Sequence, residues 1–151
     1  MNHLSVDAHR IEPKQWFDSL PLISNAVFAH HSVENVECSL IFCDNAYSAE
    51  LNQQYRNIDG PTDVLSFCAD EGDQIPGSGE EDIHYLGDIV ISLEYVEENA
   101  KHFSVPVEQE IRRVVIHGLL HLLGHTHASN DDSEPMLQLQ EKIVQTGEPL
   151  F

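Results

Sequence analysis

A chain of 151 residues is the size of one domain and is long enough to bury a core without disulfide bonds. Its 7 Lys and Arg against 26 Asp and Glu give a formal net charge of −19, which excludes a protein that holds nucleic acid by bulk charge alone. No stretch approaches the roughly 18 apolar residues of a membrane span, and the first residues lack a secretion signal, so we expect one cytoplasmic domain over residues 1–151 with no membrane partner.

The first half of the chain alternates predicted strands and helices. In chain order these are a strand at 3–9, a helix at 13–31, a strand at 35–44, a helix at 45–56, a turn at 57–61 and a strand at 62–69. Pro21 is a weakness inside the first helix because proline lacks the backbone N–H that a helix interior uses.

Three cysteines are present and none forms a CxxC pair. Cys38 and Cys43 lie five residues apart in the strand predicted at 35–44, and an odd spacing places them on opposite faces of it. We therefore predict that these two and Cys68 are free thiols, as is usual in a reducing cytoplasm.

The second half of the chain is richer in helices. The predicted elements are an acidic loop at 70–82, a strand at 85–94, helices at 94–103 and from Pro106 to Gly124, and a last helix capped by Asp131, Asp132 or Ser133. Met136, Leu139 and Ile143 fall on one side of that last helix. Strands mixed with helices predict an α+β domain with a small mixed β-sheet packed against helices.

Four histidines occur in the eleven residues HGLLHLLGHTH, 117–127, within an otherwise apolar helix. His117 and His121 are four residues apart and therefore share one helix face, a spacing that lets two imidazoles meet one metal ion. Gly118 removes a side chain between them, so that another element can approach closely. A buried, hydrogen-bonded set of rings without metal is the alternative interpretation.

The third ligand has two candidates, His125 and His127. Because Gly124 favours the end of the helix there, the chain is expected to reverse and bring His127 back to the pair, whereas His125 would serve if the helix ran on. Three protein ligands and one open position are typical of a catalytic zinc site. Gly118 stands where HExxH metallopeptidases have their general base, and Glu110, two turns away, is a poor substitute.

Three ordered motifs resemble those of the YbeY family, bacterial zinc-dependent endoribonucleases of ribosomal RNA maturation. HGLLHLLGHTH is similar to the family's HGxLHLxGYDH signature, LNQQYRNIDGPTDVLSF (51–67) to its N-x-x-x-R stretch followed by TDVLSF, and YLGDIVIS (85–92) to its L-G-D-I-x-I-S strand. The resemblance implies one zinc ion (Zn2+) held by His117, His121 and His127, a functional Arg56, and a zincin-like α+β fold. His125-Thr126 departs from the family's Tyr-Asp, so any contact that this Asp makes must come from elsewhere.

The resemblance also implies the substrate and the partners. Arg56 offers a planar fork for phosphate oxygens, and Arg112 and Arg113 are further scarce cations, although Arg113 can also pair with Glu110. We expect an enzyme that cuts single-stranded ribosomal RNA in the cytoplasm, with small-subunit ribosomal proteins or assembly factors as partners and no role for DNA. The alternatives are a metal-dependent peptidase or amidase, and a ribosome-assembly module whose metal is structural.

Overall fold

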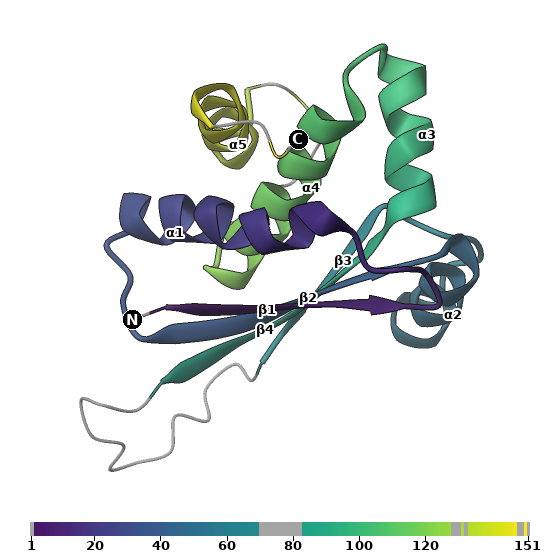
Figure 1. Cartoon of the computed structure of the whole chain (residues 1–151), viewed down its shortest axis with the longest axis horizontal. Helices are drawn as coiled ribbons and strands as arrows, with labels where there is room; N and C mark the ends of the chain where they lie inside the picture. The colour runs from purple at the N-terminus through teal and green to yellow at the C-terminus, as the bar shows by residue number, and fades with distance from the viewer. Residues whose placement is uncertain (1, 70–82, 128–130, 132, 148–149, 151) are drawn as a thin grey trace.

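A four-stranded sheet underlies a layer of helices in the computed structural model (Figure 1). The structure describes residues 2–69, 83–127, 131, 133–147 and 150, so the predicted acidic loop at 70–82 lies outside the described residues. The strands are β1 (His3–His9), β2 (Val36–Cys43), β3 (Val64–Cys68) and β4 (His84–Ser92). The helices are the 3-10 helix η1 (Gln15–Ser19), α1 (Leu20–His30), α2 (Asn45–Arg56), α3 (Leu93–Phe103), α4 (Val107–Leu122) and α5 (Pro135–Thr146).

The sheet is mixed, with strand order β1-β2-β4-β3. β1 and β4 both run parallel to the central β2, whereas β3 pairs antiparallel with β4 and forms one edge. Opposed apolar residues such as Leu40 and Ile89, or Phe42 and Ile91, set the register. The α+β prediction with a small mixed sheet is confirmed.

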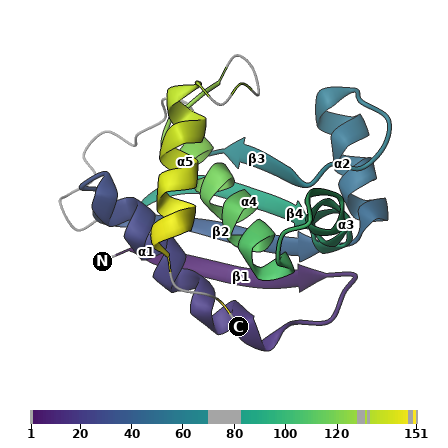
Figure 2. The ribbon, with the colours of Figure 1, turned by 90° about the horizontal axis from the view of Figure 1, so that it is seen from above.

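The main core lies between this sheet and α1 and α4, and α5 packs on α4 above them (Figure 2). Alternate residues of the central strands point into it, and the apolar face of α4 meets them with Ile116, Leu119 and Leu120, all of which are buried. At Gly118, a Cβ would lie 2.7 Å from Cγ2 of Ile89, so α4 sits close enough to β4 that any larger residue would have to displace the Ile89 side chain. The expected close approach at Gly118 is confirmed.

The opposite face of the sheet carries a smaller apolar cluster, which is covered by α2. Cys43 is buried there with Leu65 and Val90, while Cys38 is buried in the main core, so the two thiols lie on opposite faces as predicted. All three cysteines are free. None of the described helices has the length and apolar character that crossing a membrane requires.

Several predicted helix boundaries were wrong. α4 begins at Val107 and ends at Leu122 rather than at Pro106 and Gly124, and α3 begins one residue early, at Leu93. The helix expected at 13–31 is two elements, because Pro21 occupies the first turn of α1, where its missing N–H removes no hydrogen bond. The last helix takes Glu134 as its N-cap residue rather than one of the predicted caps. Asp131 instead accepts the Ser133 N–H at 2.9 Å and closes the turn before the helix, and Asp132 lies outside the described residues.

Candidate metal centre

Three imidazoles converge at the end of α4. His117 and His121 lie one helical turn apart with their Nε2 atoms 3.1 Å from each other. His127 joins them, and one ring nitrogen from each of the three lies within 4.8 Å of the others. No fourth His, Cys, Asp or Glu joins this group among the residues that the structure describes. The group could therefore hold a metal ion and leave a coordination position open.

The end of α4 explains how His127 reaches the pair. Gly124 has a φ of +99°, a left-handed conformation that glycine adopts readily, and its N–H donates to the His121 carbonyl at 3.0 Å. The His125 N–H donates to the Leu120 carbonyl at 2.9 Å, which closes the helix. The chain thus reverses at Gly124 as predicted. The ring of His125, the alternative third candidate, instead lies 2.8 Å from His31.

Hydrogen bonds fix the tautomers of the helical pair. His117 Nδ1 lies 2.6 Å from Gln140 Oε1, and His121 Nδ1 lies 3.0 Å from the His125 carbonyl oxygen. An amide or carbonyl oxygen only accepts, so each Nδ1 carries the hydrogen and each neutral ring keeps a lone pair on Nε2. Two lone pairs 3.1 Å apart repel each other unless a cation lies between them. This donor set fits a metal ion.

The environment of these rings favours their neutral form. Burial lowers the pKa of His117, and the neighbouring His127 adds to this effect, while the bond to Gln140 and the charge of Asp63 oppose it. Burial also lowers the pKa of His121, with His117 as the next cause. A neutral imidazole is the form that ligates a metal.

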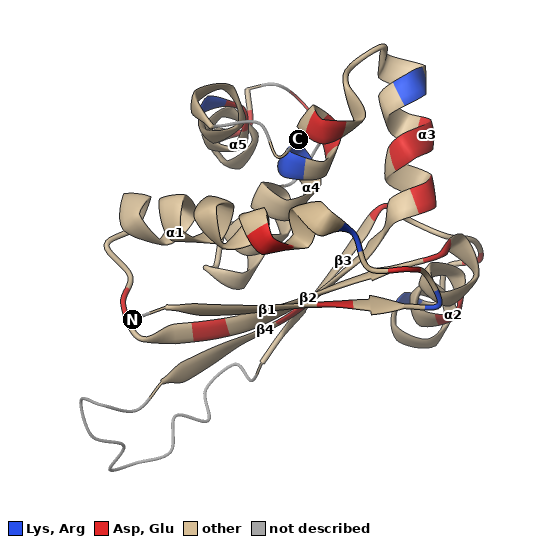
Figure 3. Ribbon diagram, in the orientation of Figure 1, with Lys and Arg blue, Asp and Glu red and all other residues tan. Residues whose placement is uncertain are grey.

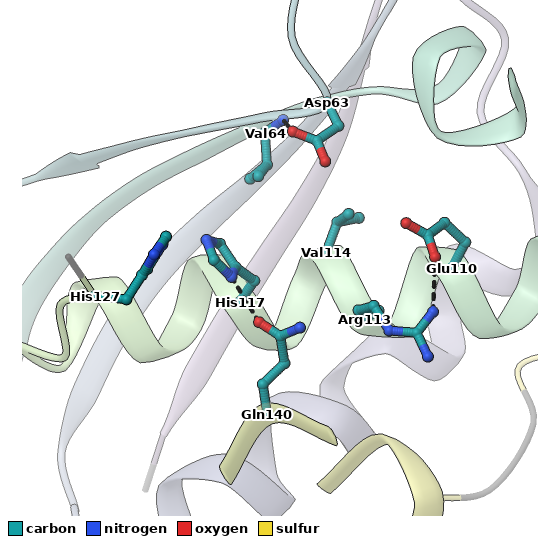
Figure 4. Close-up of a pocket in the computed structure, with 8 residues that line it drawn as sticks. All are labelled: Asp63, Val64, Glu110, Arg113, Val114, His117, His127 and Gln140. Atoms are coloured by element: carbon teal, nitrogen blue, oxygen red, sulfur yellow. Dashed lines mark hydrogen bonds and ion pairs between the residues drawn. The ribbon is translucent and has the colours of Figure 1, made fainter. Parts of the chain in front are cut away.

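A pocket opens beside His117 and His127, between α4, α5 and the start of β3 (Figure 4). Asp63 stands on its β3 wall with the carboxylate directed toward α4. Asp63 Oδ1 accepts the Val64 N–H at 2.8 Å and the Thr62 hydroxyl at 3.3 Å, and these bonds orient the carboxylate.

The far wall of the pocket is an ion pair rather than a free acid. Glu110 is buried, and its Oε1 accepts from Arg113 Nη1 at 2.7 Å. Arg113 Nε also binds Glu141 at 2.7 Å. Glu110 therefore lines the pocket with its carboxylate already engaged, whereas Asp63 has no ion pair among the described residues.

Arg56 is the last residue of α2 and its side chain is exposed. It lies near enough to His121 for its charge to lower the pKa of that ring. Of the four arginines, the other three are ion-paired within the described residues: Arg10 with Glu50, Arg112 with Glu108, and Arg113 with Glu110 and Glu141. Arg112 and Arg113, two of the scarce cations, are thus held by carboxylates, and the pairing of Arg113 with Glu110 that the sequence allowed is confirmed. Arg56 is the arginine without an ion pair among the described residues.

Sequence reasoning missed three residues around the pocket and the metal centre. Asp63 belongs to the TDVLSF stretch, which gave a signal, although no role was assigned to it. Gln140 and His31 gave none, because each reaches the centre from a helix remote in sequence, and only the tertiary structure brings them there.

Comparison with known proteins agrees with this architecture. A family model described as "Endoribonuclease YbeY" matches residues 5–148. A protein of that name from Borreliella burgdorferi (strain ZS7) is 42% identical over 139 residues, which cover 90% of this chain and 87% of that one. Another from Borrelia turicatae (strain 91E135) is 38% identical over 149 residues, 98% of this chain and 97% of that one.

A solved structure resembles the fold as well. The solution structure of TM1509 from Thermotoga maritima superposes with a TM-score of 0.65 at 30% identity, covering 94% of this chain and 87% of that chain. The match of sequence along nearly the whole length, together with the three motifs in order, leads to one conclusion: the chain belongs to the YbeY family of endoribonucleases.

Proposed function

We propose that this chain is a zinc-dependent endoribonuclease that cuts single-stranded RNA during ribosomal RNA maturation. The observation that carries the proposal is the convergence of His117, His121 and His127, with Arg56 near enough for its charge to act on His121. Arg56 is also the one arginine without an ion pair within the described residues. The names of the relatives support the same activity.

Zinc suits this donor set better than a hard cation does. Three neutral imidazoles are nitrogen ligands of the kind that zinc takes, whereas magnesium and calcium prefer oxygen. Zinc held by His117, His121 and His127 supplies Lewis acidity toward a phosphoryl oxygen. Gln140 and the His125 carbonyl orient the first two rings toward it.

Arg56 binds the phosphate of the RNA in this proposal. Its guanidinium is planar and permanently charged, and it matches two phosphate oxygens at once. In a chain of net charge −19, a guanidinium that has no ion pair among the described residues, and whose charge acts on His121, is the feature that selects a phosphodiester.

Asp63 takes the proton that the attacking oxygen, from water or from a ribose 2′-hydroxyl, must lose. Gly118 occupies the position of the HExxH base, and Glu110 is held by Arg113, so neither supplies a free carboxylate. Asp63 lines the pocket beside His117, and its bonds to Val64 and Thr62 hold it in place. As the new P–O bond forms and the bond from phosphorus to the leaving ribose oxygen breaks, the proton of the attacking oxygen passes to this carboxylate, and the leaving oxygen takes a proton from water.

The net charge bears on which partners bring the protein to its RNA. A protein of net charge −19 has weak intrinsic attraction for RNA, so we propose that small-subunit ribosomal proteins or assembly factors in the cytoplasm bring it to ribosomal RNA. We also propose that residues 1–151 act as a single domain.

The test combines zinc analysis with cleavage of a single-stranded RNA oligonucleotide and of a peptide panel. We expect about one zinc per wild-type chain, RNA cleavage and no peptide cleavage. Arg56→Ala and Asp63→Asn should retain zinc and lose at least about 100-fold in kcat/KM. Arg10→Ala, which removes an exposed pair with Glu50, is the matched control and should be unchanged.

Three outcomes would contradict the proposal. Metal-free protein with full activity would exclude the zinc, and unchanged cleavage by Arg56→Ala would exclude the phosphate contact. Hydrolysis of peptides in place of RNA would exclude the substrate class.

A further inference from the structure

A second pair of histidine rings joins α1 to the segment that follows α4. His31, the C-cap residue of α1, has its Nε2 atom 2.8 Å from Nε2 of His125. The ring centroids are 5.0 Å apart and the planes stand at 81°, so the contact is a hydrogen bond between ring edges rather than a stack. Both rings are half-buried.

The direction of this hydrogen bond follows from the other side of the His31 ring. His31 Nδ1 lies 2.8 Å from the Val27 carbonyl oxygen, which only accepts, so Nδ1 of the neutral ring carries the hydrogen. His31 Nε2 is then the acceptor, and His125 Nε2 donates to it. The ring of His125 is thereby anchored to the last turn of α1.

The backbone of His125 is part of the metal centre. Its carbonyl oxygen accepts from His121 Nδ1 at 3.0 Å, and its N–H donates to the Leu120 carbonyl at 2.9 Å. Two residues later the same segment carries His127. Gly124 precedes it with a φ of +99° and has open space around its Cβ position, so local packing at that glycine does not fix the segment.

We propose that His31 is a positioning residue for the metal centre. Its ring holds the ring of His125, which fixes segment 124–127 and so directs the His125 carbonyl at His121 and places His127. The inference rests on the metal site of the proposed function, but it is independent of the RNA substrate. It assigns a role to a residue 86 positions before His117, on an element that contributes no ligand.

The experiment measures zinc affinity by chelator competition and the visible spectrum of the cobalt(II) form, both without RNA. His31→Ala should raise the zinc Kd about 10-fold, since removal of partners that orient ligands costs about 10- to 100-fold. His31→Gln, whose amide oxygen can accept from His125, should recover most of the affinity. His102→Ala is the matched control, because His102 is exposed on α3 and its ring contacts Phe103 rather than His31 or His125, and it should leave the Kd unchanged.

Further measurements separate positioning from mere stability. His125→Ala and the double variant with His31→Ala should show the same Kd as His31→Ala alone, because the two rings act through one bond. Urea unfolding of the metal-free proteins reports stability apart from affinity. In the wild type, nitrogen-15 spectra should place hydrogens on Nδ1 of His31 and Nε2 of His125, a measurement that requires no variant to fold.

Each result has a clear reading. Equal zinc Kd values and cobalt spectra for wild type and His31→Ala would overturn the positioning role and leave the proposed function intact. Loss of stability without a change in Kd would do the same, as would the opposite tautomers in the wild type. A wild-type chain that binds no zinc would overturn both this inference and the metal of the proposed function.

Discussion

Replacement of Gln140 by leucine tests the tautomer argument at the metal centre. Gln140 is 7% exposed, and its Oε1 accepts from His117 Nδ1 at 2.6 Å while its Nε2 donates to Glu141 at 3.1 Å. The amide orientation is therefore set by Glu141, whose carboxylate can only accept. Gln140→Leu keeps a side chain of similar size and removes the acceptor.

The expected effect is a loss of zinc affinity of about 10- to 100-fold, equal to about 1.4–2.7 kcal/mol. Without Gln140, the neutral ring of His117 can move its hydrogen to Nε2 and donate it to His121 Nε2, 3.1 Å away. The metal-free protein then gains a ring-to-ring hydrogen bond worth about 1 kcal/mol, which zinc must break. In the wild type, the bond to Gln140 opposes that tautomer.

The assay is zinc competition with a fluorescent chelator, combined with urea unfolding of the metal-free protein. Gln138→Leu is the matched control, since Gln138 is exposed on the same helix two residues earlier. An unchanged zinc Kd in Gln140→Leu would refute the claim that this amide holds His117 ready for metal. A fall in affinity of equal size in Gln138→Leu would refute it as well.

Three further predictions concern packing, thiols and salt. Gly118→Ala should lower the free energy of unfolding by about 1 kcal/mol in urea titrations, because overpacking against Ile89 exceeds the gain in helix propensity; a stabilised variant would contradict this. Burial raises the pKa of Cys38 and of Cys43 to about 12, so iodoacetamide at pH 8 should modify the exposed Cys68 alone. Detection of more than one adduct on the folded chain by mass spectrometry would contradict this prediction. If Arg56 makes the one phosphate contact, a tenfold rise in salt should raise the KM for RNA by about fivefold, and a much steeper dependence would indicate a wider cationic surface.

Local patterns in the sequence predict α4, the helix that carries His117 and His121, well. The spacing of His117 and His121 and the glycine at 124 are short-range features, and helix geometry converts them directly into positions in space. The helix over 45–56 likewise matches α2 at both ends. Strand ends were less accurate: β4 stops at Ser92, because the Ser92 side chain caps α3 by accepting from the Tyr95 N–H.

Contacts between remote segments could not be predicted from the same patterns. The strand order β1-β2-β4-β3 and the approach of α5 to α4 depend on packing across the whole chain. Gln140 and His31 contact the centre only because of that packing. Asp63 was visible in its motif, but its place on the pocket wall depends on β3 pairing with β4 at the edge of the sheet.

The replacement of the family's Tyr-Asp by His125-Thr126 raised the question of what would support the ligands. Two contacts answer it without an aspartate: the His125 carbonyl accepts from His121, and the His125 ring bonds to His31. The backbone contact does not depend on which side chain stands at 125. The ring contact does, so substitutions at 125 and 31 should be coupled in their effects.

Under the proposed function, the distribution of charge bears on how an acidic protein selects RNA. Acidic residues are spread over the described helices and strands, and the cations are few (Figure 3). Carboxylates hold three of the four arginines, and the charge of −19 repels a polyanion from most of the surface. Arg56 is exempt from this pairing within the described residues and stands near His121. RNA bound in this way would be held at the reactive phosphate and little elsewhere. Tight non-specific binding of the RNA product would then not limit turnover. In the proposed function, a partner protein would bring the enzyme to the correct RNA.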